Sequence, residues 1–357
     1  MIRIDACDER IFCHRSSAAV FERKIESGGI DLNNHEIKIF AGSSGKAFAE
    51  KMCRYIGVDL GQSETITFSE GNTFVRIGET VRDKDVYLVQ SIGLRPNDEF
   101  VEILFWADAF KRASANSVTI ILPYFSYAKG DKKDEPRVSI RARVCAESME
   151  LGGVDRIVAM DLHSQQIQGF FKKPVDHLFA LPVLCEAVKR LKLADPVVVS
   201  PDAGFAKQAR KFAEHLGASI AIGDKTRRSH NERAELLELI GDVAGKTAVI
   251  VDDFSISGGT LTEIAQLLKQ RGAVSVIACL SHLVLSEAAV KKLDASPIER
   301  IIGTDSVDNP HLVHSNKMMR VSAAPLFGEA VSRIHRRESL SPLFDIVPEQ
   351  VIDSSLG

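Results

Sequence analysis

The 357-residue sequence has no cysteine arrangement of the kind that holds a metal ion or a disulfide framework. Its six cysteines are scattered without a Cys-x-x-Cys pair, and its histidines form no cluster at zinc-ligand spacing. A zinc module and a small disulfide-stapled scaffold are therefore excluded. We expect reduced, mostly buried thiols, which are typical of a cytosolic protein.

The sequence also lacks an excess of positive charge and any long apolar run. Its 45 Lys and Arg residues stand against 48 Asp and Glu residues, giving a formal net charge of -3. That balance gives no basis for general binding to nucleic acid or to an anionic membrane. No stretch approaches the ~20 apolar residues that cross a bilayer, and the N-terminal residues lack the apolar run of a signal peptide. We expect a soluble, cytoplasmic protein with no nucleic-acid or membrane partner.

What remains is an ordinary globular composition, with 45% hydrophobic and 26% charged residues. At about 150 residues per domain, the length predicts roughly two domains. From residue 37 onwards, short apolar runs alternate with helical patterns, as in the strand 37–40 and the helix 46–56. This alternation predicts an α/β fold with parallel sheets covered by helices on both faces. Because no low-complexity linker is present, we expect the domains to join closely near Pro182.

The segment 247–260, TAVIVDDFSISGGT, joins an apolar strand to two adjacent acids and a glycine-rich turn before the helix 261–270. The carboxylates of Asp252 and Asp253 can accept hydrogen bonds from vicinal sugar hydroxyls at the carboxyl edge of a sheet, where open α/β sheets bind ligands. The next residues offer N–H and hydroxyl donors to an anion at the start of the helix. They are Ser255, Ser257, Gly258, Gly259 and Thr260. The pattern indicates a sugar-phosphate site; the alternative is a tight strand-to-helix turn with solvated acids.

This loop resembles the phosphoribosyl-pyrophosphate loop that phosphoribosyltransferases share with ribose-phosphate pyrophosphokinases. Further segments resemble the second group, and the resemblance extends from about residue 37 to residue 344. They are ITFSEGNTFVRIGE (66–79), VYLVQS (86–91), PYFSYAKGDKKDEPR (123–137), MDLHSQQIQGFF (160–171), VSPDAG (199–204), DKTRR (224–228) and ESLSPLF (338–344). Simple phosphoribosyltransferases have no counterpart to most of them.

The resemblance implies two tandem phosphoribosyltransferase-like domains, 37–182 and 183–330. The tail 331–349 would pack back on the first, and residues 1–36 would be an extension of unknown role. The implied reaction transfers the diphosphoryl group of Mg-ATP to O1 of ribose 5-phosphate, giving phosphoribosyl pyrophosphate (PRPP) and AMP. Mg²⁺ is the implied cofactor, and the implied assembly is a homo-oligomer, a hexamer in the family, with the ATP site completed across an interface.

The resemblance also implies roles for single residues. Lys225 and Arg227 match the pair that the family places over the β-phosphate, within a charged lid loop. His163 and Asp202 match metal ligands. The implied ATP contacts are Phe68, Glu70, Asn72, Lys129, Asp131, Asp134 and His163. The loop from Asp252 to Thr260 would bind ribose 5-phosphate.

Each assignment has an ordinary structural alternative. A lone histidine such as His163 is more often structural than a ligand. Asp202 precedes a predicted helix and could serve as its N-cap. Phe68 could be a core aromatic, and Lys225 with Arg227 could belong to a solvated surface run.

The sequence departs from the family pattern at three places. Ile256 stands where many members have an aspartate, and isoleucine cannot accept a hydrogen bond from ribose. Lys129 and Gly130 stand where an Arg-Gln pair is usual, which removes the bidentate guanidinium fork. Asn72 ends a hairpin pattern that usually ends in Glu. These departures favour a second hypothesis, a non-catalytic subunit that binds nucleotide or partner synthetases; a phosphoribosyltransferase is a third.

Overall fold

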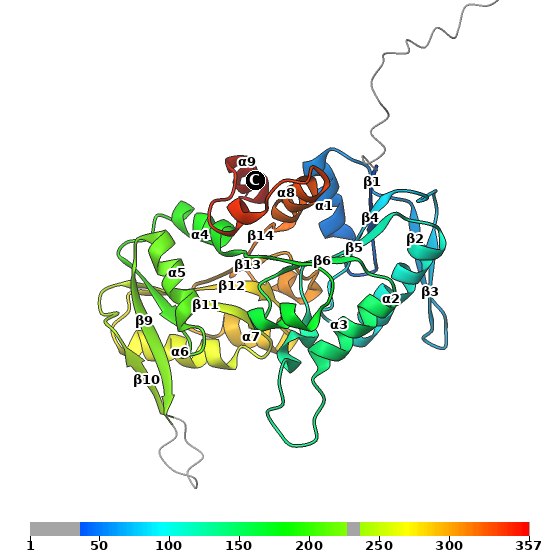
Figure 1. Cartoon of the computed structure of the whole chain (residues 1–357). Helices are drawn as coiled ribbons and strands as arrows, with labels where there is room; N and C mark the ends of the chain where they lie inside the picture. Colours follow the sequence, from blue (N-terminus) through cyan, green and yellow to red (C-terminus); the bar gives the residue numbers. More distant parts are fainter. Residues whose placement is uncertain (1–35, 227–235, 357) are drawn as a thin grey trace, which may run out of the picture. The chain divides into compact units, whose positions relative to one another are not determined.

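The computed structural model describes residues 36–226 and 236–356, and Figure 1 shows the arrangement of their elements. The first sheet has the order β1-β4-β5-β6-β7, and all of its neighbouring strands are parallel. Its strands are β1 (Ile37–Ala41), β4 (Asp85–Val89), β5 (Ser117–Leu122), β6 (Arg156–Met160) and β7 (Val175–Leu178). A separate antiparallel hairpin is formed by β2 (Ser63–Thr67) and β3 (Thr73–Ile77). The helical elements of this half are α1 (Lys46–Ile56), α2 (Pro96–Arg112), α3 (Arg141–Leu151), η1 (Ser126–Gly130) and η2 (Gln165–Phe170).

The second sheet has the order β10-β9-β8-β11-β12-β13-β14, and within it β10 pairs antiparallel to β9 while the other neighbouring pairs are parallel. Its strands are β8 (Pro196–Ser200), β9 (Ser219–Thr226), β10 (Leu236–Ile240), β11 (Thr247–Ser255), β12 (Ser275–Leu283), β13 (Arg300–Thr304) and β14 (Met318–Val321). The accompanying helices are α4 (Leu181–Arg190), α5 (Ala206–Leu216), α6 (Gly259–Gln270), α7 (Glu287–Asp294), α8 (Ala324–His335) and α9 (Glu349–Leu356), with η3 (Pro310–His314) and η4 (Ser341–Phe344).

Successive residues of the central strands face opposite sides of their sheet, as the period of two requires. Val249 and Val251 of β11 belong to a core that also contains Leu184 of α4. Ala248 and Ile250 of the same strand belong to a second core beneath α6 and α7. The predicted α/β class, with parallel sheets flanked by helices, is therefore confirmed.

One hydrophobic core is shared by the two sheets. It includes Ile39 and Val158 from the first sheet, Cys279 from the second and Phe327 from α8. Helix α8 packs against α1, and the Tyr55 hydroxyl donates a hydrogen bond to a Glu329 oxygen at 3.0 Å. Because this core and the described residues form one compact unit, the domain bounds 37–182, 183–330 and 331–349 stay a prediction.

Several strands are longer than their apolar runs suggest. The sequence predicts a strand over 247–251, yet β11 continues to Ser255 because its backbone stays paired with β12, with Phe254 opposite His282. The helix 46–56 has the predicted bounds, whereas the predicted boundary at Pro182 lies in the first turn of α4.

Two further expectations concern thiols and membranes. Cys53, Cys145, Cys185 and Cys279 are free and buried, as expected for reduced thiols. In the described residues, no helix is long and apolar enough to cross a membrane.

Candidate functional site

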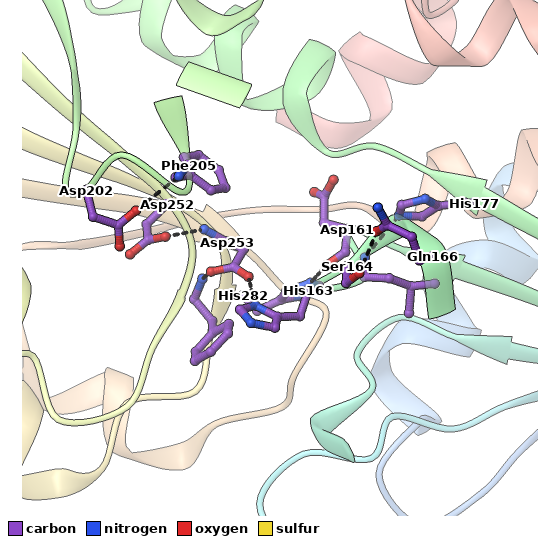
Figure 2. Close-up of polar contacts among 12 residues, drawn as sticks. Asp161, His163, Ser164, Gln166, His177, Asp202, Phe205, Asp252, Asp253 and His282 are labelled. Atoms are coloured by element: carbon purple, nitrogen blue, oxygen red, sulfur yellow. Dashed lines mark hydrogen bonds and ion pairs between the residues drawn. The ribbon is translucent and has the colours of Figure 1, made fainter. Parts of the chain in front are cut away.

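Asp252 and Asp253 lie in the last part of β11, at the carboxyl edge of the second sheet, where the sequence places them (Figure 2). The Asp253 N–H donates to Asp252 Oδ1 at 2.9 Å, and the Phe254 N–H donates to Asp253 Oδ1 at 2.9 Å. These local bonds fix one oxygen of each carboxylate to the backbone. Both residues line a cavity, so their remaining acceptor capacity is available to a ligand.

His163 follows β6 of the first sheet, yet it reaches the acidic pair of the second. Its Nδ1 lies 2.8 Å from Asp253 Oδ2 (Figure 2). This hydrogen bond raises the pKa of His163, because the neighbouring carboxylate stabilises the imidazolium. The contact brings together two segments that the sequence separates by 90 residues.

Burial and the charge of Asp253 both raise the pKa of Asp252, in that order of size. Two adjacent carboxylates in a half-buried position are costly when both are ionised. A bound cation or a set of hydroxyl donors lowers that cost. The electrostatics of the pair therefore favour a metal-bound or polyhydroxylated ligand.

The turn after β11 presents the start of a helix to the same cavity. Gly258 precedes α6 with a φ of 68°, the left-handed region that favours glycine, and α6 begins at Gly259 without a side-chain cap. The Gly259 N–H lies 3.4 Å from Ser257 Oγ. Free N–H groups at a helix start form an anion site, which fits the predicted phosphate cradle.

Asp202 both orders a turn of the backbone and lines the cavity. Its Oδ1 accepts a hydrogen bond from the Phe205 N–H at 3.0 Å in the turn before α5 (Figure 2). Phe205 is itself the N-cap residue of α5, so Asp202 orders the turn and is not the predicted helix cap. The residue is exposed and lines the cavity. One oxygen therefore orders the turn, and the second is available to a metal ion or a ligand.

One solvent-open cavity, with an empty volume of about 1280 Å³, collects most of these groups; we call it the site cavity. From the predicted set it is lined by Asp131, His163, Asp202, Asp252, Asp253, Ser255, Ser257, Gly259 and Thr260. Lys132 and Ile256 also line it. The loop after β5, the loop after β6 and the β11–α6 turn thus meet at one place.

Lys129 lies beside the site cavity. Its Nζ is 4.0 Å from the centre of the Phe254 ring, a cation–π contact. Burial lowers the pKa of Lys129, while the charge of Asp253 opposes that shift. The ammonium therefore lies against the Phe254 ring, within the influence of the Asp253 charge.

The hairpin residues and Asp134 do not line the site cavity of their own chain. Phe68 is 43% exposed, which excludes the packed-core alternative, and its ring centre lies 6.3 Å from that of Phe74. Glu70, Asn72 and Asp134 are exposed. Within one chain, these four residues therefore do not line the same cavity as Asp252 and Asp253.

The proposed catalytic pair is only partly covered by the structure. Lys225 lies near the end of β9, where its backbone pairs with Leu237 of β10. Arg227 lies outside the described residues. The loop 224–235 predicted as a lid is therefore described only at its first three residues.

Sequence reasoning missed two residues that support the site. His282 is 1% exposed; its Nδ1 lies 2.8 Å from Ser306 Oγ and its Nε2 lies 3.4 Å from the Asp161 carbonyl oxygen. Burial lowers the pKa of His282 to about 4, and burial raises the pKa of Asp161 to about 6. The only signal for Asp161 was its place two residues before His163, and His282 was hidden within an apolar strand.

Two of the departures from the family pattern have a local structural context. A Cβ at Gly130 would lie 2.6 Å from Arg141 Nε, so the glycine leaves room for that guanidinium. Ile256 is 46% exposed and faces no packed core. An apolar side chain therefore lines the site cavity at the position where an acceptor was expected.

Among the described residues, no group of three or more His, Cys, Asp or Glu side chains could by itself hold a metal ion. Mg²⁺ does not require one, because it usually binds through one or two carboxylates together with substrate phosphates and water. Asp202 provides one carboxylate and His163 an imidazole in the same cavity, and Asp252 lines it as well. The donors therefore fit a metal ion that arrives with a phosphorylated substrate.

The parallel sheets flanked by helices and the acidic, glycine-rich strand-to-helix turn define an α/β protein with a candidate sugar-phosphate site. The N-terminal domain of ribose phosphate pyrophosphokinase matches residues 37–153, and the phosphoribosyl synthetase-associated domain matches residues 229–345. The chain belongs to the ribose-phosphate pyrophosphokinase family, and it is an enzyme of that family.

Individual relatives agree with this assignment. The chain is 43% identical to a ribose-phosphate pyrophosphokinase of Synechocystis sp. over 313 residues, covering 87% of this chain and 94% of the relative. It is 42% identical to that of Thermosipho africanus, covering 88% and 99%. The crystal structure of phosphoribosylpyrophosphate synthetase from Mycobacterium smegmatis aligns with a TM-score of 0.79 at 34% identity, covering 85% of this chain and 99% of that one.

Proposed function

We propose that the chain transfers the diphosphoryl group of Mg-ATP to O1 of ribose 5-phosphate. The bond between the α- and β-phosphates breaks, the bond from O1 to the β-phosphorus forms, and the products are PRPP and AMP. The observation that carries the proposal is the 2.8 Å contact of His163 with Asp253. It joins the loop after β6, on the proposed nucleotide side, to the proposed ribose 5-phosphate loop in one cavity.

Ribose 5-phosphate occupies the β11–α6 side of the site cavity in this proposal. The carboxylates of Asp252 and Asp253 accept hydrogen bonds from the ring hydroxyls. The 5-phosphate lies at the uncapped start of α6, where N–H groups and the helix dipole stabilise an anion. Its contacts come from Ser255, Ser257, Gly258, Gly259 and Thr260. Ile256 leaves one sugar hydroxyl without the acceptor that an aspartate would provide.

We assign the metal site to Asp202 and His163, with Mg²⁺ as the ion. Bound Mg²⁺ would neutralise phosphate charge and orient the diphosphoryl group. His163 Nδ1 is engaged by Asp253, which fixes the ring orientation and leaves Nε2 as the atom directed to the ligand. Asp202 contributes the carboxylate oxygen that its hydrogen bond to Phe205 leaves available.

Lys225 and Arg227 are the proposed catalytic pair. Phosphoryl transfer depends mainly on positioning and on cations that stabilise the charge of the transferring group. The backbone of β9 carries Lys225 to the end of the second sheet beside β8, the strand that precedes Asp202. The lid that we assign to the loop 224–235 would cover the β-phosphate once ATP is bound.

The nucleotide contacts are assigned to Lys129, Asp131, Asp134 and His163 from one chain, and to Phe68, Glu70 and Asn72 from the hairpin of a second copy. The exposure of Phe68 supports this division, since a 43% exposed ring that does not line its own cavity is available to stack on the adenine of a neighbour. A homo-oligomer is therefore part of the proposal, and a hexamer is the assembly that the family resemblance implies.

The Lys225→Ala variant tests the proposed catalytic role. Turnover should fall by about 10²-fold or more while the affinity for ribose 5-phosphate stays nearly unchanged, because the lysine acts on the transferring group and not on the sugar. Lys292→Ala, which removes an exposed lysine of α7, is the matched control and should leave turnover unchanged. Wild-type turnover in Lys225→Ala would contradict the assigned role.

A further inference from the structure

A second cavity lies apart from the site cavity and shares none of its lining residues. Its empty volume is about 1060 Å³, and we call it the α9 pocket. Helix α1 contributes Lys51, Arg54 and Tyr55, and the β14 segment contributes Arg320. The end of α9 closes it with Ser354, Ser355 and Leu356. Helix α9 follows the matched range 229–345, so this wall lies outside the matched family domain.

The charge that lines the α9 pocket is positive, with three basic residues against one carboxylate. That carboxylate, Asp305, is fully engaged. Its Oδ2 accepts from Lys51 Nζ at 2.6 Å and from Ser322 Oγ at 2.7 Å, and its Oδ1 accepts from the Ala323 N–H at 2.8 Å. In residues 36–226 and 236–356, neither Arg54 nor Arg320 makes an ion pair or a side-chain hydrogen bond. Among the described residues, these two guanidinium groups at the α9 pocket thus have no anionic partner.

Ser355 provides a second, independent sign of a ligand. It is 5% exposed, it lines the α9 pocket, and its Oγ has no hydrogen-bond partner in the part of the chain that the structure describes. Its position is fixed, because its carbonyl oxygen accepts from the Ser322 N–H at 2.9 Å and the nearby Val351 is fully buried. Buried hydroxyls in native proteins are almost always satisfied, so this hydroxyl is available to a bound molecule, an ion or an ordered water.

We propose that the α9 pocket binds the phosphate group of a small phosphorylated molecule, at a site distinct from the one that performs the proposed reaction. Arg54 and Arg320 would hold the phosphate oxygens in charge-assisted, fork-shaped hydrogen bonds. The Ser355 hydroxyl would donate to a third oxygen. Arginine suits this task better than lysine because its planar donors match the geometry of a phosphate.

The methyl group of Met319, which lines the α9 pocket, reports on its occupancy. The test is a methyl-methionine NMR titration of the full-length protein with inorganic phosphate, at an ionic strength kept constant with chloride. Met160, which lines a small cavity with His163, reports on the catalytic side in the same spectrum. The Met319→Leu variant assigns the signal. The proposal predicts a saturable shift of the Met319 methyl signal.

Substitutions distinguish a specific phosphate site from nonspecific electrostatic attraction of an anion. Arg54→Ala with Arg320→Ala should weaken the binding that Met319 reports by at least about 10-fold, and Ser355→Ala should weaken it by about 3-fold or more. Arg271→Ala with Arg300→Ala is the matched control, since both arginines are exposed and lie outside the pocket; it should leave the titration unchanged. No saturable Met319 shift, or one that persists unweakened in the Arg54→Ala, Arg320→Ala variant, overturns the proposal.

Discussion

His163 Nδ1 and Asp253 Oδ2 lie 2.8 Å apart and connect the carboxyl edges of two different sheets. His163 follows β6 of the first sheet, and Asp253 lies just beyond the buried part of β11 in the second. Each residue is held by its own strand, so the contact depends on the packing of the two sheets through their shared core. The proposed nucleotide and sugar sides of the site are therefore positioned by the same apolar contacts that stabilise the fold.

The first prediction concerns this contact. His163→Ala should lower PRPP formation by about 10²-fold, because it removes the imidazole that we assign to the metal site together with the link to Asp253. The measurement is the steady-state rate of AMP and PRPP production. His314→Ala removes an exposed histidine of η3 and serves as the control, with an expected wild-type rate. A fully active His163→Ala variant would assign the histidine a structural role only.

The second prediction concerns stability and pH. His177 is 6% exposed, and its Nε2 accepts a hydrogen bond from the Leu162 N–H at 3.0 Å, so the native state requires the neutral ring. Burial lowers its pKa to about 4 in the folded protein, against about 6.5 in the unfolded chain. Its contribution is therefore fully present above about pH 6.5 and is lost as the pH falls towards 4.

Urea titrations between pH 7 and pH 4 give the free energy of unfolding and test whether stability falls as the pH is lowered. His177→Gln should be less stable at pH 7, and its stability should fall less steeply over this range. One histidine changes the free energy of unfolding by at most about 1.4 kcal/mol per pH unit. His314→Gln should keep the wild-type slope. A slope in His177→Gln equal to that of the wild type would refute the buried-neutral assignment.

The third prediction compares two neighbouring glycines. Gly258 has a φ of 68°, and a Cβ there would lie 3.0 Å from Leu293 Cγ. A Cβ at Gly259 would make only an ordinary contact, 3.5 Å from Ser257 Oγ. Gly258→Ala should destabilise the protein by about 1–2 kcal/mol through backbone strain, while Gly259→Ala should change the melting temperature little. Equal melting temperatures for the two variants would contradict the assigned turn geometry.

The fourth prediction addresses the departure at Ile256. Its side chain is 46% exposed and lines the site cavity, so a polar replacement meets no packed core. Ile256→Asp should lower the KM for ribose 5-phosphate by about 3- to 10-fold, because it restores an acceptor for a sugar hydroxyl. Val274→Asp, at another exposed apolar position outside the cavity, is the control. An unchanged or raised KM in Ile256→Asp would show that the sugar is held without this position.

The strand and helix order was predictable because hydrophobic period and turn residues are local signals. The run 247–251, the acids after it and the glycines before α6 place Asp252, Asp253 and Gly258 correctly from sequence alone. The ends of β11 and β12 were not predictable, because polar residues there are held by pairing between strands and not by burial.

The contact between His163 and Asp253 could not be predicted from the sequence of either segment alone. It follows from the packing of two sheets, and the family resemblance predicted only that both residues act at one site. Buried His282 and Asp161 had no distinguishing local pattern, since a histidine inside an apolar strand reads as part of the core. The position of Phe68 away from its own cavity likewise depends on tertiary structure.

The most direct test of the account mixes the purified full-length protein with ribose 5-phosphate, ATP and Mg²⁺ and follows the products by chromatography. The account predicts AMP and PRPP in equal amounts, with formation of both abolished when Mg²⁺ is chelated. A folded sample that binds ATP but yields no PRPP would contradict the proposed reaction and would instead favour the non-catalytic subunit.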